Sequence, residues 1–235
     1  MKIRQILSLI IVSIVVCVFH VCGPRKDTIP VDDGLITAPQ QRLNTAQLFF
    51  YEHGILRWRL DTDYMERPLS DTGNIFVVPV DITVYDTLGN LSTRIVSDSG
   101  TSSSQMEIFD LWGNVHIENE DGSIVKSDKL RWTRNLRPSA RTRPGAETFD
   151  LWGNVYIENE DGMIVRSEQL RWLRGQKRIT SETFVQVETT KGDILRGKGL
   201  DAIDDFSRFS FKAEVSGRFP DFRQRMEEGD EDFFR

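Results

Sequence analysis

A 26-residue segment of this chain occurs twice, forty positions apart. Residues 109–134 read FDLWGNVHIENEDGSIVKSDKLRWTR, and residues 149–174 read FDLWGNVYIENEDGMIVRSEQLRWLR. Twenty aligned positions are identical and six differ, namely His116/Tyr156, Ser123/Met163, Lys126/Arg166, Asp128/Glu168, Lys129/Gln169 and Thr133/Leu173. Repeat architectures grow by adding units that bury an apolar face against a neighbour, whereas a single active-site cleft rarely survives such an insertion. The duplication therefore favours an extended β surface.

Each copy has the pattern of two strands joined by a tight hairpin. The Trp-Gly-Asn triplet at 112–114 predicts a turn or bulge, because glycine tolerates positive φ. Val115 and Ile117 alternate with polar residues, and the segment 119–122 ends in the Asp-Gly pair of a hairpin turn. Short strands and turns also alternate elsewhere from Leu43 onward, with almost nothing that predicts a long helix. We expect an all-β, antiparallel domain.

The first residues predict a membrane anchor. Residues 6–21 are almost wholly apolar behind a basic start, a run of roughly 16 residues against the ~20 that span a bilayer. No small-residue cleavage site follows, which favours an uncleaved transmembrane helix at 1–25 over a signal peptide. A lipoprotein modified at Cys22 is the alternative.

Composition divides the remainder of the chain into three parts. Prolines and acidic residues at 26–44 predict a linker, and 45–217 carry the strand patterns of the β domain. Residues 218–235 mix acids with phenylalanines and predict a charged C-terminal tail.

Several classes of site are not predicted. Both cysteines, Cys17 and Cys22, lie in or beside the anchor, so the β domain has no disulfide, thiolate cluster or cysteine nucleophile. A net charge of −6 argues against nucleic-acid binding. His116 is Tyr156 in the second copy, so the unit does not depend on an imidazole. With no nucleophile elbow, phosphate-binding glycine loop or metal-ligand spacing, we expect no catalytic residue, metal or cofactor.

Two other features allow more than one interpretation. Trp112, Trp132, Trp152 and Trp172 recur at matched positions; core packing is the simpler explanation, and the alternative is that they line an apolar groove for a ligand. The arginine-rich segment 135–147 between the copies predicts either a solvated loop or an anionic-ligand patch.

In their order along the chain, these patterns resemble the LptC family, the periplasmic, membrane-anchored component of the lipopolysaccharide export ABC transporter. The likeness covers most of 45–216: DITVYDTLGNLSTRIVSD at 81–98, LWGNVYIENEDGMIVRSEQLRW at 151–172, RITSETFVQVET at 178–189 and GDILRGKGL at 192–200. It implies an elongated antiparallel β-jellyroll of the OstA/LptA type. The family usually has one such unit, so the second copy implies roughly two to four extra strands, a lengthening of ~5–10 Å.

The resemblance also implies a function. The protein would sit in the inner membrane with its domain in the periplasm, without enzymatic activity. It would accept lipopolysaccharide from an inner-membrane LptB2FG-like ABC transporter and pass it along an apolar trough to an LptA-like periplasmic jellyroll protein. A covered trough is needed because each acyl methylene exposed to water costs ~0.8 kcal/mol. The alternatives are a carbohydrate-binding module with tryptophans stacked on sugars, and a pure envelope scaffold.

Strand alternation within this resemblance predicts which residues carry the function. The trough-facing set, expected to contact acyl chains, is Val115, Ile117, Leu130, Trp132, Val155, Ile157, Leu170 and Trp172. The edge strand expected to dock the next jellyroll carries Phe209, Phe211 and Val215.

Overall fold

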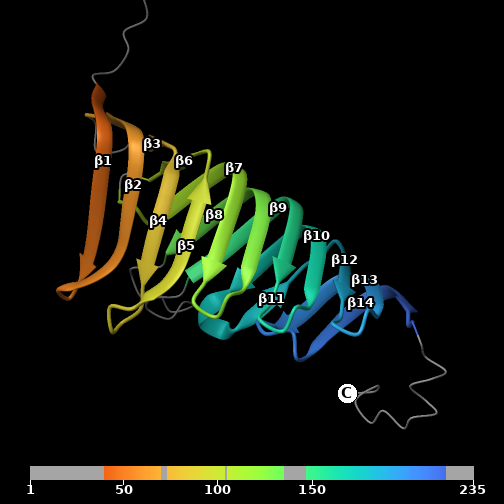
Figure 1. The fold of residues 1–235 in the computed structure, drawn as a ribbon. Coiled ribbons are helices and arrows are strands. Elements are labelled where there is room, and N and C mark those ends of the chain that lie inside the picture. The colour runs from red at the N-terminus through yellow and green to blue at the C-terminus, as the bar shows by residue number, and fades with distance from the viewer. Residues whose placement is uncertain (1–39, 70–72, 104, 135–146, 221–235) are drawn as a thin grey trace, which may run out of the picture. The chain divides into compact units, whose positions relative to one another are not determined.

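The computed structural model of the protein describes residues 40–69, 73–103, 105–134 and 147–220. These residues form a 14-stranded sheet in which every strand pair is antiparallel, with the strands side by side in a row (Figure 1). In chain order they are β1 (Gln40–Glu52), β2 (Ile55–Pro68), β3 (Ile75–Val78), β4 (Val80–Tyr85), β5 (Leu91–Ser97), β6 (Ser99–Ser102), β7 (Ile108–Asn119), β8 (Ile124–Arg134), β9 (Glu147–Glu158), β10 (Ile164–Leu173), β11 (Arg178–Thr180), β12 (Phe184–Glu188), β13 (Ile194–Ile203) and β14 (Phe209–Arg218).

The predicted membrane anchor, residues 1–25, lies outside the described residues, as do most of the predicted linker and the end of the predicted tail. Within the described ranges, the helical structure is a single 3-10 turn, Arg174–Gln176. No helix in these ranges is long and apolar enough to cross a membrane.

The long strands bend, so that each contributes to two layers. The first part of β7 pairs with β6, where Trp112 lies opposite Ser99, and the second part pairs with β5, where His116 lies opposite Val96. We call layer 1 the sheet of β3, β6, β11 and residues 108–112, 129–134, 147–152 and 169–173. Layer 2 is the sheet of β4, β5, β12 and residues 115–119, 124–127, 155–158 and 164–167. Two antiparallel layers around one core confirm the expected jellyroll.

Each copy of the repeat forms one hairpin of two bent strands. β7 and β8 come from the first copy, and β9 and β10 from the second. Because all four strands cross both layers, the second copy adds two strands to each layer. At about 4.8 Å per strand this lengthens the sheet by ~10 Å, the upper end of the range expected from the sequence.

The bends are produced by the repeated Gly-Asn pair. Gly153 and Asn154 both have positive φ (72° and 47°), as do the equivalent residues of the first copy, 113 and 114. Gly153 and Asn154 lie opposite the single residue Glu168 of β10, which makes a bulge and turns the strand from one layer into the other. The Asn154 side-chain amide donates to Asp128 Oδ2 at 2.9 Å, fixing the bend to the previous strand.

This bend gives a stability prediction. In Gly153→Ala the new Cβ would lie 2.4 Å from Asp128 Oδ2 and 2.9 Å from its Cβ, so the Asp128 side chain must rotate and its backbone must shift, which releases Asn154. We expect unfolding to become easier by about 2–4 kcal/mol, combining positive-φ strain with a lost charge-assisted hydrogen bond. Gly162→Ala is the matched control: its φ is 82°, but its nearest neighbour is Thr190 Cγ2 at 3.6 Å. Urea denaturation should give about 1–2 kcal/mol for the control, and equal losses would contradict this account.

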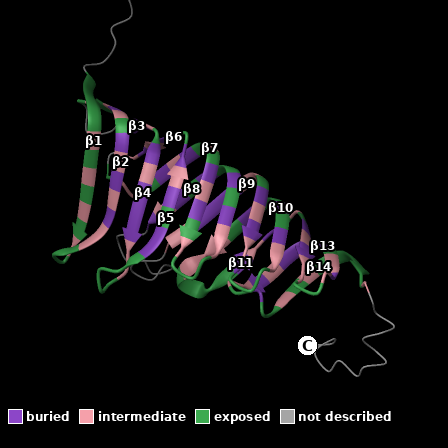
Figure 2. Cartoon of the chain, viewed as in Figure 1, coloured by how far each residue is buried: buried purple, intermediate pink, exposed green. Residues whose placement is uncertain are grey.

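Side-chain burial alternates along the strands, most clearly in β7 to β10 (Figure 2).

β1 begins at Gln40, inside the segment expected to be a linker, and β14 ends at Arg218. The first six residues of β1 are all exposed, so no apolar alternation marks them in the sequence. Pairing with β2, and not burial, holds this part of β1 in the sheet.

Candidate functional site

The predicted trough-facing residues lie in the interior between the two layers. Seven of the eight are at most 5% exposed, and Trp172 is partly buried against the same core. Val115 and Ile117 follow the bend of β7, whereas Leu130 and Trp132 precede Arg134 at the end of β8; their copies repeat this arrangement. Their contact with lipid remains a prediction. In this structure their neighbours are other side chains of the core.

Aromatic rings form a continuous row inside the jellyroll. The successive centroid distances are 5.5 Å for Phe50–Trp58, 5.6 Å for Trp58–Phe109, 5.1 Å for Phe109–Trp132, 5.9 Å for Trp132–Phe149 and 5.2 Å for Phe149–Trp172. This aromatic row runs over six strands, and the repeat supplies four of its six members. Each such pair adds about 0.5–1.5 kcal/mol beyond simple burial. The duplication therefore extends one interior surface.

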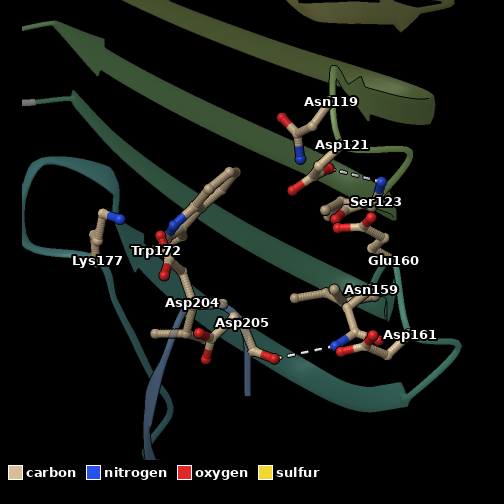
Figure 3. A pocket seen from close by; sticks show the side chains of 13 residues that line it. Asn119, Asp121, Ser123, Asn159, Glu160, Asp161, Trp172, Lys177, Asp204 and Asp205 are labelled. Atoms are coloured by element: carbon tan, nitrogen blue, oxygen red, sulfur yellow. Dashed lines mark hydrogen bonds between the residues drawn. The ribbon is translucent and has the colours of Figure 1, made fainter. Parts of the chain in front are cut away.

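An opening leads to this interior where the layers meet opposite the bends. We call this line the seam: hairpin tips 119–123 and 159–163 of layer 2 face loops 174–177 and 204–208 of layer 1. Figure 3 shows Trp172 and Lys177 on one side of the opening, and Asn119 and Asp121 on the other. The cavity here measures about 280 Å³ and reaches the core residues Val125, Ile157 and Ile179.

Among the described residues, side-chain hydrogen bonds join the two layers at the seam. The Asn159 side-chain amide donates to the backbone oxygen of Asp205 at 3.0 Å, a contact visible in Figure 3. Further along, Arg174 Nη2 donates to Ser92 Oγ at 2.6 Å. These bonds link a hairpin and a strand of layer 2 to loops of layer 1.

The rim of the opening is acidic. Five carboxylates and one amine line it, namely Asp121, Glu160, Asp161, Asp204 and Asp205 with Lys177. Hydrogen bonds from the Ser207 backbone and side chain lower the pKa of Asp205, which keeps that carboxylate charged at neutral pH. Apolar groups can pass this rim, but it repels anions.

Arg134 is a residue that the sequence interpretation missed. Its side chain is only 6% exposed, and its guanidinium carbon lies 4.7 Å from the Phe50 ring centroid and 5.5 Å from that of Trp132. Burial lowers the pKa of the Arg134 guanidinium, and the Glu147 carboxylate, 3.7 Å from its Nε, partly opposes this. A signal was present: Leu130, Trp132 and Arg134 are spaced by two, so the arginine continues the inward face.

The other two repeated tryptophans point outward. Trp112 is 37% exposed and Trp152 partly so, and both lie opposite Lys129 on either side of β8. They form a surface depression with Leu130 and Arg131. This is the surface that the carbohydrate-binding alternative would use, and it is separate from the interior.

The predicted docking strand β14 lies at one end of the sheet. Within the described residues it pairs with β13 alone, and β1 at the other end pairs with β2 alone. Phe209 and Phe211 are half-buried against the core, and Val215 is 60% exposed. Among the described residues, each of these end strands therefore has one edge that pairs with no other strand. Elsewhere, the described part of the chain contains no cluster of three or more side chains suited to a metal ion.

Comparisons with known proteins bear on these features. Residues 25–134 match the family described as "Lipopolysaccharide-assembly, LptC-related". The match covers just under half of the chain, includes the first copy of the repeat, and confirms the resemblance seen in the sequence. A similar solved structure is LptH from Pseudomonas aeruginosa, the LptA-homologous periplasmic component of the lipopolysaccharide transport device. It has 10% identity and a TM-score of 0.46 over 54% of this chain and 94% of that one. No curated protein matches the chain.

Proposed function

We propose that this chain, which is LptC-related over residues 25–134, is a non-enzymatic carrier in lipopolysaccharide transport. It accepts the lipid from an inner-membrane ABC transporter, holds the acyl chains between its two layers, and passes them to a periplasmic jellyroll protein. The N-terminal segment anchors it in the inner membrane with the β domain in the periplasm. Energy comes from the transporter, since the β domain only has to bind and release.

The continuous apolar interior is the observation that carries this proposal. The aromatic row and the buried aliphatic residues extend unbroken through both copies of the repeat. Each acyl methylene removed from water contributes ~0.8 kcal/mol, so a chain of a dozen carbons gains on the order of 10 kcal/mol by entering. Entry would replace contacts among core side chains with contacts to the lipid. This requires the seam to separate along its length.

Transfer to a partner uses the free edge of β14. An open strand edge can accept a strand from another sheet, which continues the backbone hydrogen bonding from one protein to the next. Half-buried Phe209 and Phe211 place apolar surface at that junction. The interior of one jellyroll would thereby continue into that of its neighbour.

Site-specific photo-crosslinking tests the lipid route. A photoreactive amino acid at Ile117, Ile157 or Leu170, all at most 5% exposed, should give lipopolysaccharide adducts in cells that make this lipid. Glu118 and Glu158 are the controls, because each is adjacent to a test position and lies on the opposite face of its strand. Adducts at the inward positions should exceed those at the controls by tenfold or more. Folded, abundant protein without adducts at any inward position would exclude the carrier function.

A further inference from the structure

The guanidinium group of Arg134 is buried without the hydrogen bonds that such a group requires. Its Nε and Nη1 atoms have no acceptor, although the side chain is only 6% exposed. A guanidinium carries five N–H donors, and burial without acceptors is strongly unfavourable. A position that could hold leucine or methionine at no such cost instead holds an arginine.

The contacts of Arg134 with Glu147 are too long to compensate. Glu147 Oε1 lies 3.7 Å from Arg134 Nε, and Glu147 Oε2 lies 3.5 Å from Arg174 Nη1. Paired guanidinium and carboxylate groups ordinarily approach to about 2.7–2.9 Å. One carboxylate thus stands between two arginines, the last residues of the two repeat copies, with a long hydrogen bond of 3.5 Å to Arg174 and an ion pair of 3.7 Å with Arg134.

The neighbouring buried polar groups share this excess of donors. In the described part of the chain, every buried side-chain nitrogen or oxygen without a hydrogen-bond partner is an N–H donor: Arg57 Nε, Arg134 Nε and Nη1, and the indole nitrogens of Trp58, Trp132 and Trp172. Of these, Arg57 Nε is in an ion pair of 3.4 Å with Glu52. Trp58 and Trp132 lie 5.9 and 5.5 Å, ring centroid to guanidinium carbon, from Arg134. A ligand that fits here must bring acceptor oxygens and no donors, beside an apolar part that meets the aromatic row.

We infer that Arg134 and Arg174 bind a phosphate group of the transported lipid, with the acyl chains lying along the aromatic row. A phosphate monoester brings negative charge and several acceptor oxygens, and arginine is the side chain best matched to it. Glu147 occupies the position between the arginines when lipid is absent. The inference rests on the proposed carrier function and assigns where the lipid head lies.

Space and charge favour the region around Arg134 and Arg174 over the acidic opening as the phosphate site. A cavity of about 300 Å³ is lined by Arg57, Arg174, Glu147 and Ser92. Arg134 lies behind Glu147, outside this lining, and is reached when Glu147 moves aside. Asp86 also lines it, but its carboxylate accepts the backbone N–H groups of Leu88 and Asn90 within its own turn. At the opening beside Trp172, five carboxylates repel a phosphate. Acyl chains and phosphate are therefore directed to different parts of the seam.

Lipid binding by the full-length protein in detergent micelles tests the site. The probes are phosphorylated lipid A and the same lipid after phosphatase treatment, with inorganic phosphate as competitor. Arg134→Met should weaken binding of phosphorylated lipid A by about 10- to 100-fold, as expected for charge-assisted hydrogen bonds, and change binding of the dephosphorylated lipid less than threefold. The affinity of Arg134→Lys for phosphorylated lipid A should lie between those of the wild type and Arg134→Met. Arg131→Met is the control, since Arg131 is 52% exposed and paired with Asp110 on the outer face.

Thermal unfolding of the same variants separates this role from a structural one. Because the buried guanidinium lacks acceptors, its removal should leave the Tm unchanged or raise it while binding falls. Equal weakening of both lipids by Arg134→Met, or a lowered Tm with unchanged lipid preference, would overturn the phosphate site alone. If inorganic phosphate binds at Arg134 and the wild-type protein binds both lipids equally well, the site is one for free phosphate instead. Wild-type protein that binds neither lipid would overturn the carrier function together with this site.

Discussion

A cross-link between positions 159 and 205 should stop lipid from entering the jellyroll. Asn159 and Asp205 face each other across the seam, joined by a hydrogen bond of 3.0 Å. The opening beside them measures about 280 Å³, below the ~300–1,000 Å³ of ordinary small-ligand sites, so a lipid with several acyl chains needs the seam to separate. With both residues changed to cysteine and joined by a short, cleavable bifunctional thiol reagent, we expect lipid loading to fall at least tenfold. Reductant should restore it.

The control for this experiment is a cross-link that leaves the seam free. Lys126 and Tyr156 are paired across β8 and β9 within layer 2, so Lys126→Cys with Tyr156→Cys joins neighbours in one sheet. The native Cys17 and Cys22 are replaced by serine in both proteins. Lipid loading is measured from photo-crosslinked adducts at Leu170. Unchanged loading of the seam-locked protein would contradict entry through the seam and favour entry from the end of the sheet.

The fold was largely predictable because the two-residue alternation of apolar and polar side chains recurs through the chain. Alternation of apolar and polar residues placed Val115, Ile117 and their copies on the inner face, and the structure buries them. The Gly-Asn pair after Trp112 predicted a turn or bulge, and it forms the bulge that bends the strand between layers. These features are local, so a single sequence contains them.

Features that depend on distant partners could not be predicted in the same way. The exposed start of β1 is held by backbone pairing with β2, which leaves no side-chain pattern. A different kind of miss concerns Trp112 and Trp152, which face outward because they lie three residues after the inward Phe109 and Phe149; this alternation is local, and the sequence interpretation did not use it.

Arg134 shows a third limit. Charged residues are expected outside, so its place in the inward alternation after Trp132 went unused. Only the packed structure reveals that its guanidinium lies among aromatic rings without close partners. Departures of this kind from the apolar pattern are where ligand-binding residues are found.

Removal of one whole repeat unit should leave a folded jellyroll, whereas removal of half a unit should not. Deleting residues 135–174 joins Arg134, the last residue of β8, to Gly175, so that β8 leads into the turn that now follows β10. β10 pairs with β12 through Val165 and Ser167 and with β11 through Trp172, and the equivalent residues of β8 are identical. β8 can therefore take the place of β10 in both layers. We expect cooperative thermal unfolding with a Tm lowered by roughly 5–10 °C, about 2–3 kcal/mol for a chain of this size.

Deletion of residues 159–174 is the contrasting change, because it removes the hairpin tip and β10 but keeps β9. β9 runs opposite to β10, so it would meet β11 and β12 in a parallel arrangement, and its end would lie in layer 2 while residue 175 begins in layer 1. The three residues left between β9 and β11, 175–177, cannot join parallel strands, which need long crossover connections. We expect this shorter deletion to give insoluble protein or no cooperative transition by circular dichroism. If the 16-residue deletion folded as well as the 40-residue one, the repeat would not be the unit by which this jellyroll grows.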